Sequence, residues 1–133
     1  MAYVEVSRQE AERQGYADRV SYHHGNFTDV APTIADADIV TLDRVICCYP
    51  DVQALVGLSA ARARHLYGVV YPQDGWFNQL FVASVNLVFR LRRCAMRSFV
   101  HQPDIVDAIM RSHGLRRRFY GKSFPWQIVV YGR

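Results

Sequence analysis

The sequence predicts an α/β protein in which helices flank a mostly parallel sheet with one antiparallel strand at its edge. Apolar, β-favouring runs at 39–42 and 66–72 are separated by a helical segment, the pattern of parallel strands joined by a crossover. The last two strand-like segments, 115–121 and 126–131, are joined by a few residues around Pro125. So short a connection predicts an antiparallel pair.

The composition limits the size and class of the protein. The chain has 133 residues, 50% of them hydrophobic, so it can bury one core and form one domain, residues 1–133. Its formal net charge is +4, but acidic residues lie among the basic ones throughout, so no nucleic-acid partner is expected. Three cysteines provide no disulfide framework, and the first residues form a charged helix rather than an apolar signal. We therefore expect a cytoplasmic protein with reduced thiols.

Four segments have the apolar period of a helix together with a start or stop signal. They are residues 3–14 before Gly15, 52–66 after a capping Asp51, 75–93 after a capping Asp74, and 103–113, which begins with Pro103 and precedes Gly114.

Two further segments predict strands whose ends are candidate ligand positions. Residues 18–24 alternate between apolar and polar types before Gly25, as a short strand does. The run 39–42 is compact, mostly apolar and β-favouring, typical of a strand covered on both faces, and Asp43 and Arg44 follow it. Because ligands in open α/β sheets bind outside the carboxyl ends of strands, a ligand is expected at these two places.

Several stretches resemble the class I S-adenosylmethionine-dependent methyltransferases, from the helix after their second strand onward. HHGNF stands where that family has Gly-Asp-hydrophobic after its third strand, and VTLDRV stands at its fourth. HQPDIVDAIMRSHGLRRRFYGKS and WQIVVYG match its closing helix, glycine and two strands, so the resemblance covers essentially the whole chain. It implies a Rossmann-like methyltransferase sheet, S-adenosylmethionine as cofactor and a small-molecule methyl acceptor.

The resemblance also implies an incomplete sheet. The family has a Gly-rich loop after its first strand and an acidic residue after its second, and both precede the helix with which this chain begins. No G-x-G-x-x-G pattern occurs in the 133 residues. We therefore expect a domain that is truncated at its N-terminus relative to the family. Because such a sheet exposes its edges, a homodimer or a partner at an edge is also expected.

The resemblance assigns site residues one by one. Asn26 and Phe27 would flank the adenine, Asp43 and Arg44 would line the cofactor pocket near the methionine, and Tyr49 would line the acceptor pocket. Simpler interpretations remain open: Asn26 as a turn residue, Asp43 in an ion pair with Arg44, and Tyr49 in a plain turn. No catalytic acid or base is assigned, because methyl transfer depends mostly on positioning.

The helix at 75–93 allows three interpretations. Its apolar stripe consists of Phe77, Leu80, Phe81, Ser84, Val88 and Leu91. Burial of this stripe in the core or a dimer contact is the simplest interpretation, and a wall for a hydrophobic acceptor is the second. Arg90, Arg92, Arg93 and Arg97 at one end support a third, a membrane surface, although the helix is too short and mixed to span a bilayer.

The sequence also bears on two other classes of function. His23 and His24 with Cys47 and Cys48 do not predict a metal site, because neighbours on a strand point to opposite faces and the paired-cysteine spacing is absent. A catalytically silent binding or protein-interaction module with this half of the fold is the alternative to methyl transfer.

Overall fold

The computed structural model of the chain describes residues 2–95 and 97–133. It divides into two compact units, Met1–Thr33 and Ile34–Arg133. The first unit contains the helix α1 (Ala2–Arg13), the short helix α2 (Phe27–Val30) and two 3-10 turns. α1 confirms the predicted helix, and Gly15 follows it with φ of 74°, a left-handed conformation that glycine adopts with little strain.

The strand predicted at 18–24 is wrong. Ala17–Arg19 forms a 3-10 turn, and residues 20–24 join no sheet in the described part of the chain. Tyr22 instead donates its hydroxyl hydrogen bond to the Ser7 carbonyl oxygen at 2.8 Å, which ties this segment to α1. Alternating polarity predicts a strand only where a neighbouring strand completes the hydrogen-bond ladder.

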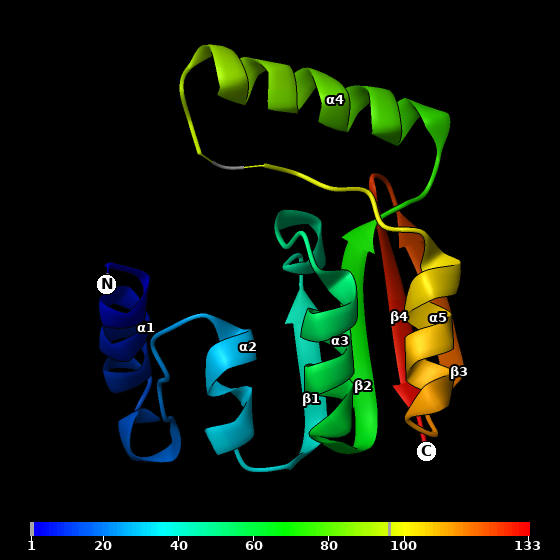
Figure 1. Cartoon of the computed structure of the whole chain (residues 1–133). Helices are drawn as coiled ribbons and strands as arrows, with labels where there is room; N and C mark the ends of the chain where they lie inside the picture. The colour runs from blue at the N-terminus through cyan, green and yellow to red at the C-terminus, as the bar shows by residue number, and fades with distance from the viewer. Residues whose placement is uncertain (1, 96) are drawn as a thin grey trace. The chain divides into compact units, whose positions relative to one another are not determined.

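The second unit alternates strands and helices (Figure 1). In chain order its elements are β1 (Ala37–Asp43), the 3-10 turn η3 (Ile46–Cys48), α3 (Val52–Ala61), β2 (Ala63–Pro72), α4 (Trp76–Leu91), α5 (Pro103–Ser112), β3 (Arg116–Ser123) and β4 (Trp126–Gly132). The helices predicted here are confirmed, although α3 ends at Ala61 because Ala63 already pairs with β1.

The two predicted aspartate caps have different outcomes. Asp51 caps α3, because its carboxylate accepts a hydrogen bond from the Ala54 backbone N–H at 2.9 Å. The cap predicted at Asp74 is wrong. Gly75 occupies the N-cap position of α4, and the Asp74 carboxylate accepts from the Gln79 side chain at 3.2 Å instead.

The α/β class is confirmed. In the described residues the sheet has four strands in the order β1-β2-β4-β3, with β1 parallel to β2 and both contacts of β4 antiparallel. Three strands therefore run in one direction, and the antiparallel strand β4 lies one position in from the edge rather than at it.

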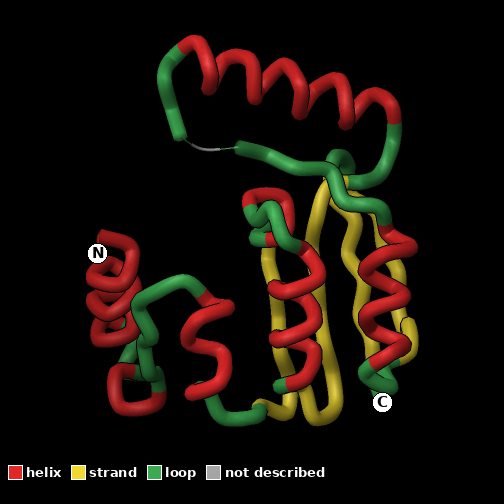
Figure 2. The backbone as a smooth tube through the Cα atoms, viewed as in Figure 1, coloured by secondary structure: helices red, strands yellow, loops and turns green. Residues whose placement is uncertain are grey.

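The core lies between the sheet and two helices. α3 and α5 contact each other and cover the same face of the sheet (Figure 2). Alternate residues of β2 and β4 point to this face and are buried, as the pleat of a strand requires. The largest fully buried side chains include Tyr67, Tyr71, Tyr131, Ile46, Leu55, Met110, Leu115, Val56, Val69 and Val106.

The opposite face of the sheet is exposed. The prediction that 39–42 is covered on both faces is wrong, because β1 is an edge strand and the Ile39 side chain is 59% exposed. Leu66, Phe119 and Ile128 on the other strands are exposed as well. Their register with β1 and β4 places all of them on the face opposite α3 and α5.

The apolar stripe predicted on α4 is also exposed, so its burial in the core is wrong for this chain. Asn78 is the buried residue of that helix. None of the helices in the described residues is long and apolar enough to cross a membrane.

Candidate functional site

The carboxyl ends of the two parallel strands lie beside each other. Asp43, the last residue of β1, pairs with Val70, two residues before β2 ends. The next backbone N–H, that of Arg44, donates to the Val70 carbonyl oxygen at 2.9 Å and closes the ladder. Arg44 has φ of 55°, a left-handed conformation uncommon outside glycine. The chain therefore turns sharply into η3 and leaves the Asp43 side chain at the carboxyl end of β1.

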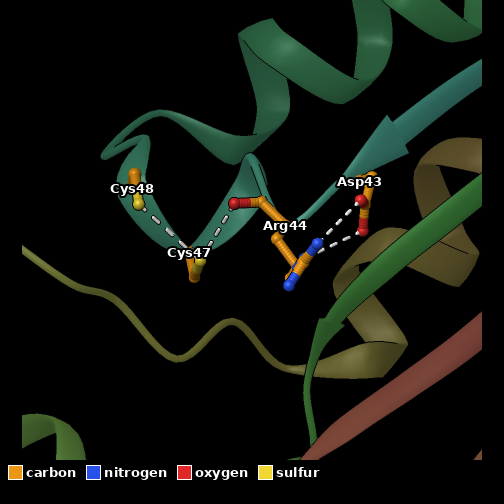
Figure 3. Close-up of polar contacts among 4 residues, drawn as sticks. All are labelled: Asp43, Arg44, Cys47 and Cys48. Carbon is orange, nitrogen blue, oxygen red and sulfur yellow. Dashed lines mark hydrogen bonds and ion pairs between the residues drawn. The ribbon is translucent and has the colours of Figure 1, made fainter.

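Asp43 and Arg44 form a two-point ion pair (Figure 3). Arg44 Nε lies 3.2 Å from Asp43 Oδ1, and Nη2 lies 3.3 Å from Oδ2. The Arg44 guanidinium also lies 5.8 Å from the ring centroid of Trp126. Both side chains of the pair are more than half exposed, and such pairs contribute only about 0–1 kcal/mol. A ligand can therefore replace either partner at little cost.

Cys47, in the turn that follows, lacks the reactivity of a nucleophile. Cys47 is buried, and its Sγ donates to the Arg44 carbonyl oxygen at 3.4 Å (Figure 3). Burial, with the neighbouring Cys48 thiol, raises the pKa of Cys47 to about 11. It is thus protonated at neutral pH, whereas attack and metal binding need the thiolate. Among the described residues, no group of three or more His, Cys, Asp or Glu side chains could hold a metal ion.

Tyr49 lies at the end of η3, where His101 holds the backbone in place. The His101 Nε2 atom is 3.0 Å from the Ile46 carbonyl oxygen and 3.1 Å from that of Tyr49. The Phe99 backbone N–H donates to the Cys47 carbonyl oxygen at 2.7 Å. The segment before α5 thereby fixes the turn that follows Asp43, and the Tyr49 side chain is half-buried in it.

An apolar cavity of about 110 Å³ lies at the same end of the sheet. Its lining comes from the end of β2, the start of β4, α4 and the adjoining loops: Cys47, Pro72, Asn78, Phe81, Val82, Val85, Ser98, Pro125 and Trp126. Sequence reasoning missed these residues as a group. The signal in the sequence is Asn78, a polar residue in an apolar helix, which donates to the Gln73 carbonyl oxygen at 2.8 Å and holds the start of α4 over the cavity.

The remaining predicted site residues belong to the first unit. Asn26 is exposed at the N-cap position of α2. Its backbone carbonyl oxygen accepts hydrogen bonds from the backbone N–H groups of Asp29 and Val30. Phe27 is half-buried. The structure thus brings Asp43 and Arg44 together and places Tyr49 on the following turn, all in the second unit. A shared site that includes Asn26 and Phe27 stays a prediction.

Solved structures share this fold. An O-methyltransferase family protein from Burkholderia thailandensis matches with a TM-score of 0.73 and 14% identity, over 97% of this chain and 40% of that chain. A mitomycin 7-O-methyltransferase matches with a TM-score of 0.69 and 22% identity, over 97% and 38%. The magnesium protoporphyrin IX methyltransferase from Synechocystis PCC 6803, with bound SAH, matches at 0.65 and 15%, over 92% and 58%.

These matches confirm the resemblance to methyltransferases as a shared fold. The chain spans 38% to 58% of the length of the three proteins. The sequence matches no protein-family model, and no relative is found among curated proteins.

Proposed function

We propose that the chain takes part in methyl transfer from S-adenosylmethionine to a small hydrophobic molecule. The observation that supports this most is the fold, which it shares with O-methyltransferases, together with an exposed carboxylate and an apolar cavity at the carboxyl edge of its parallel strands. Open α/β sheets bind their ligands at this edge.

The residues at the edge suit part of the cofactor. The Asp43 carboxylate can accept hydrogen bonds from an amino or hydroxyl group, and Arg44 can pair with a carboxylate such as that of a methionine moiety. On the first unit, the Asn26 amide and the Phe27 ring suit an adenine, by a hydrogen bond and by ring contact. S-adenosylmethionine supplies an electrophilic methyl group, and its transfer by in-line displacement depends mainly on how the reactants are positioned.

The acceptor would bind in the cavity between α4 and the ends of β2 and β4. Its walls are mostly aliphatic and aromatic, so they suit an apolar group rather than a charged one. The half-buried Tyr49 lies on the turn that contributes Cys47 to the same cavity. At about 110 Å³ the cavity admits part of a ring system, and the rest of the acceptor would remain outside it.

Replacing Asp43 by alanine tests this proposal. Because the 133 residues contain no G-x-G-x-x-G loop, we expect weak cofactor binding, best measured by NMR titration of the chain with S-adenosylmethionine. Asp43→Ala should weaken binding about tenfold or more, the effect of losing a hydrogen bond to a charged group. Cys48→Ala is the control, because Cys48 is exposed and lies at the end of η3, past the carboxyl end of β1. Equal losses in the two variants would show that the site is elsewhere.

A protein-interaction module is the second candidate, and the exposed face and edge of the sheet favour it. Among the described residues β1 pairs with a strand on one side alone, and Ile39 is exposed, so a second copy or a partner could add to the sheet there. We expect the chain to elute in size-exclusion chromatography with light scattering above its monomer mass of 15.3 kDa. Ile39→Lys on the edge should restore the monomer, whereas Leu58→Lys on α3 should not. A monodisperse wild-type monomer at about 10–100 μM, the range in which exposed strand edges associate, would refute this candidate.

A further inference from the structure

The helix α4 turns two amide side chains, those of Asn78 and Asn86, toward the protein and a broad apolar face outward. Asn78 is buried and bonded to the Gln73 carbonyl oxygen at 2.8 Å. The Asn86 amide exchanges two hydrogen bonds of 2.8 Å with the backbone of Ser98. These contacts fix which side of α4 faces inward.

The outward side of α4 is apolar. With 3.6 residues per turn, residues 77, 80, 81, 84, 87, 88 and 91 share one side of the helix, and all of them are exposed. Six of the seven are Phe, Leu or Val, and Ser84 is the exception. We call this set the outer face of α4. Trp76, exposed at the start of the helix, contacts Phe77 edge to face at 5.9 Å, and Phe77 lies 6.1 Å from the exposed ring of Phe124.

The charge around the outer face is mostly positive. Residues 75–103 contain no Asp or Glu, and the acidic residues that adjoin this stretch are Asp74 and Asp104. The stretch contains four arginines, all exposed and all at or beyond the C-terminal end of α4: Arg90, Arg92, Arg93 and Arg97. The segment therefore has an aromatic cluster at one end, a row of aliphatic side chains along its length and a cluster of positive charge at the other end.

We infer that α4 docks on an anionic lipid bilayer and lies in the plane of its interface. Amphipathic helices that bind in this way combine an exposed apolar face with aromatic residues and arginines that reach the headgroups. A second copy of the chain is a poorer occupant, because its α4 offers one adjoining carboxylate, Asp74, which already accepts from Gln79, against four arginines. Anionic headgroups supply the missing negative charge. This inference does not depend on methyl transfer, although docking there would place the cavity beneath α4 near apolar acceptors.

Cosedimentation of the 133-residue chain with phosphatidylcholine vesicles, with and without phosphatidylglycerol, tests the inference. We expect binding to the anionic vesicles, weaker binding to the neutral ones, and release at high salt. Arg92→Gln with Arg93→Gln should weaken binding about fivefold for each arginine, from the contribution of one basic residue at an anionic surface. Leu80→Gln with Leu91→Gln should weaken it about tenfold, because both side chains leave the outer face.

Val6→Gln is the matched control. Val6 is 63% exposed and Leu80 is 59% exposed, but Val6 lies on α1, so this variant should bind vesicles as the wild type does. Thermal unfolding followed by circular dichroism checks that every variant is folded. Absence of binding to anionic vesicles would overturn the inference, as would binding that the α4 variants leave unchanged. A wild-type dimer that the Leu80 and Leu91 replacements dissociate, without vesicle binding, would overturn it in favour of self-association.

Discussion

Replacing Leu55 by alanine is expected to lower the free energy of unfolding by about 2–5 kcal/mol, the usual range for a buried leucine. Leu55 lies on α3 and is 1% exposed. α3 and α5 contact each other across this part of the core, where Val106 and Met110 of α5 are also fully buried. Truncation removes apolar contacts and leaves a cavity that the two helices and the sheet can close only in part.

Leu58→Ala is the control for this prediction. Leu58 lies three residues later on the same helix and is 37% exposed, so its truncation should cost less than about 1 kcal/mol. Urea unfolding of both variants measures the difference. The midpoint should fall for Leu55→Ala while the slope with denaturant stays the same. Similar losses for the two variants would mean that the buried side of α3 has been assigned wrongly.

Replacing Ser59 by alanine is expected to cost about 1–3 kcal/mol, because it leaves a buried hydroxyl without its partner. The hydroxyls of Ser59 and Tyr67 lie 2.7 Å apart, and both residues are buried. Ser59 also donates toward the Leu55 carbonyl oxygen of the preceding turn at 2.7 Å. Adding Tyr67→Phe to Ser59→Ala should restore part of the loss, since the double variant has no orphaned hydroxyl at this place.

Tyr71→Phe is the matched control for the Ser59 prediction. Tyr71 lies on the same strand and the same buried face as Tyr67, but its hydroxyl has no hydrogen-bond partner among the described residues. Burial raises the pKa of both tyrosines, so both are neutral phenols near pH 7. Thermal unfolding of the wild type, Ser59→Ala, Tyr67→Phe and the double variant gives the coupling energy between the two hydroxyls. A loss for Tyr71→Phe as large as for Ser59→Ala would show that the difference in partners has no energetic effect.

Local signals in the sequence predicted the helices and most strands. Gly15 and Gly114 follow helices and have φ of 74° and 75°, a conformation for which glycine has no steric penalty. Pro103 begins α5, and Asp51 caps α3. Each of these signals acts within one turn of backbone, so the chemistry of a few residues decides the outcome.

The wrong predictions depended on neighbours distant in sequence. Residues 18–24 have the alternation of a strand but pair with no strand in the described part of the chain. Ile39 is an apolar residue of the kind usually found in a core, but it lies on an edge strand. The order of strands in a sheet cannot be predicted from the residues of one strand. The outer face of α4 follows the period of a buried helix, and only the contacts of Asn78 and Asn86 show that its apolar side faces outward.

The candidate site was partly predictable for the same reason. Asp43 and Arg44 are adjacent in sequence, so the ion pair between them follows from one strand end. The cavity collects residues from Cys47 to Trp126, whose meeting depends on β4 entering the sheet beside β2. No local pattern encodes that contact.

The direction of β4 determines where a label or a solid support can be attached to this protein. Trp126 pairs with Pro72 near the carboxyl ends of β1 and β2, and Gly132 pairs with Leu66 six residues further along β4. At about 3.4 Å per residue of an antiparallel strand, the two pairs lie about 20 Å apart. The backbone N–H of Arg133 donates to the His65 carbonyl oxygen at 3.2 Å, which fixes Arg133 at that far end of the strand. A fluorophore or affinity handle joined after Arg133 would therefore leave Asp43 accessible, so immobilised chains can be used for ligand measurements without blocking the edge under study.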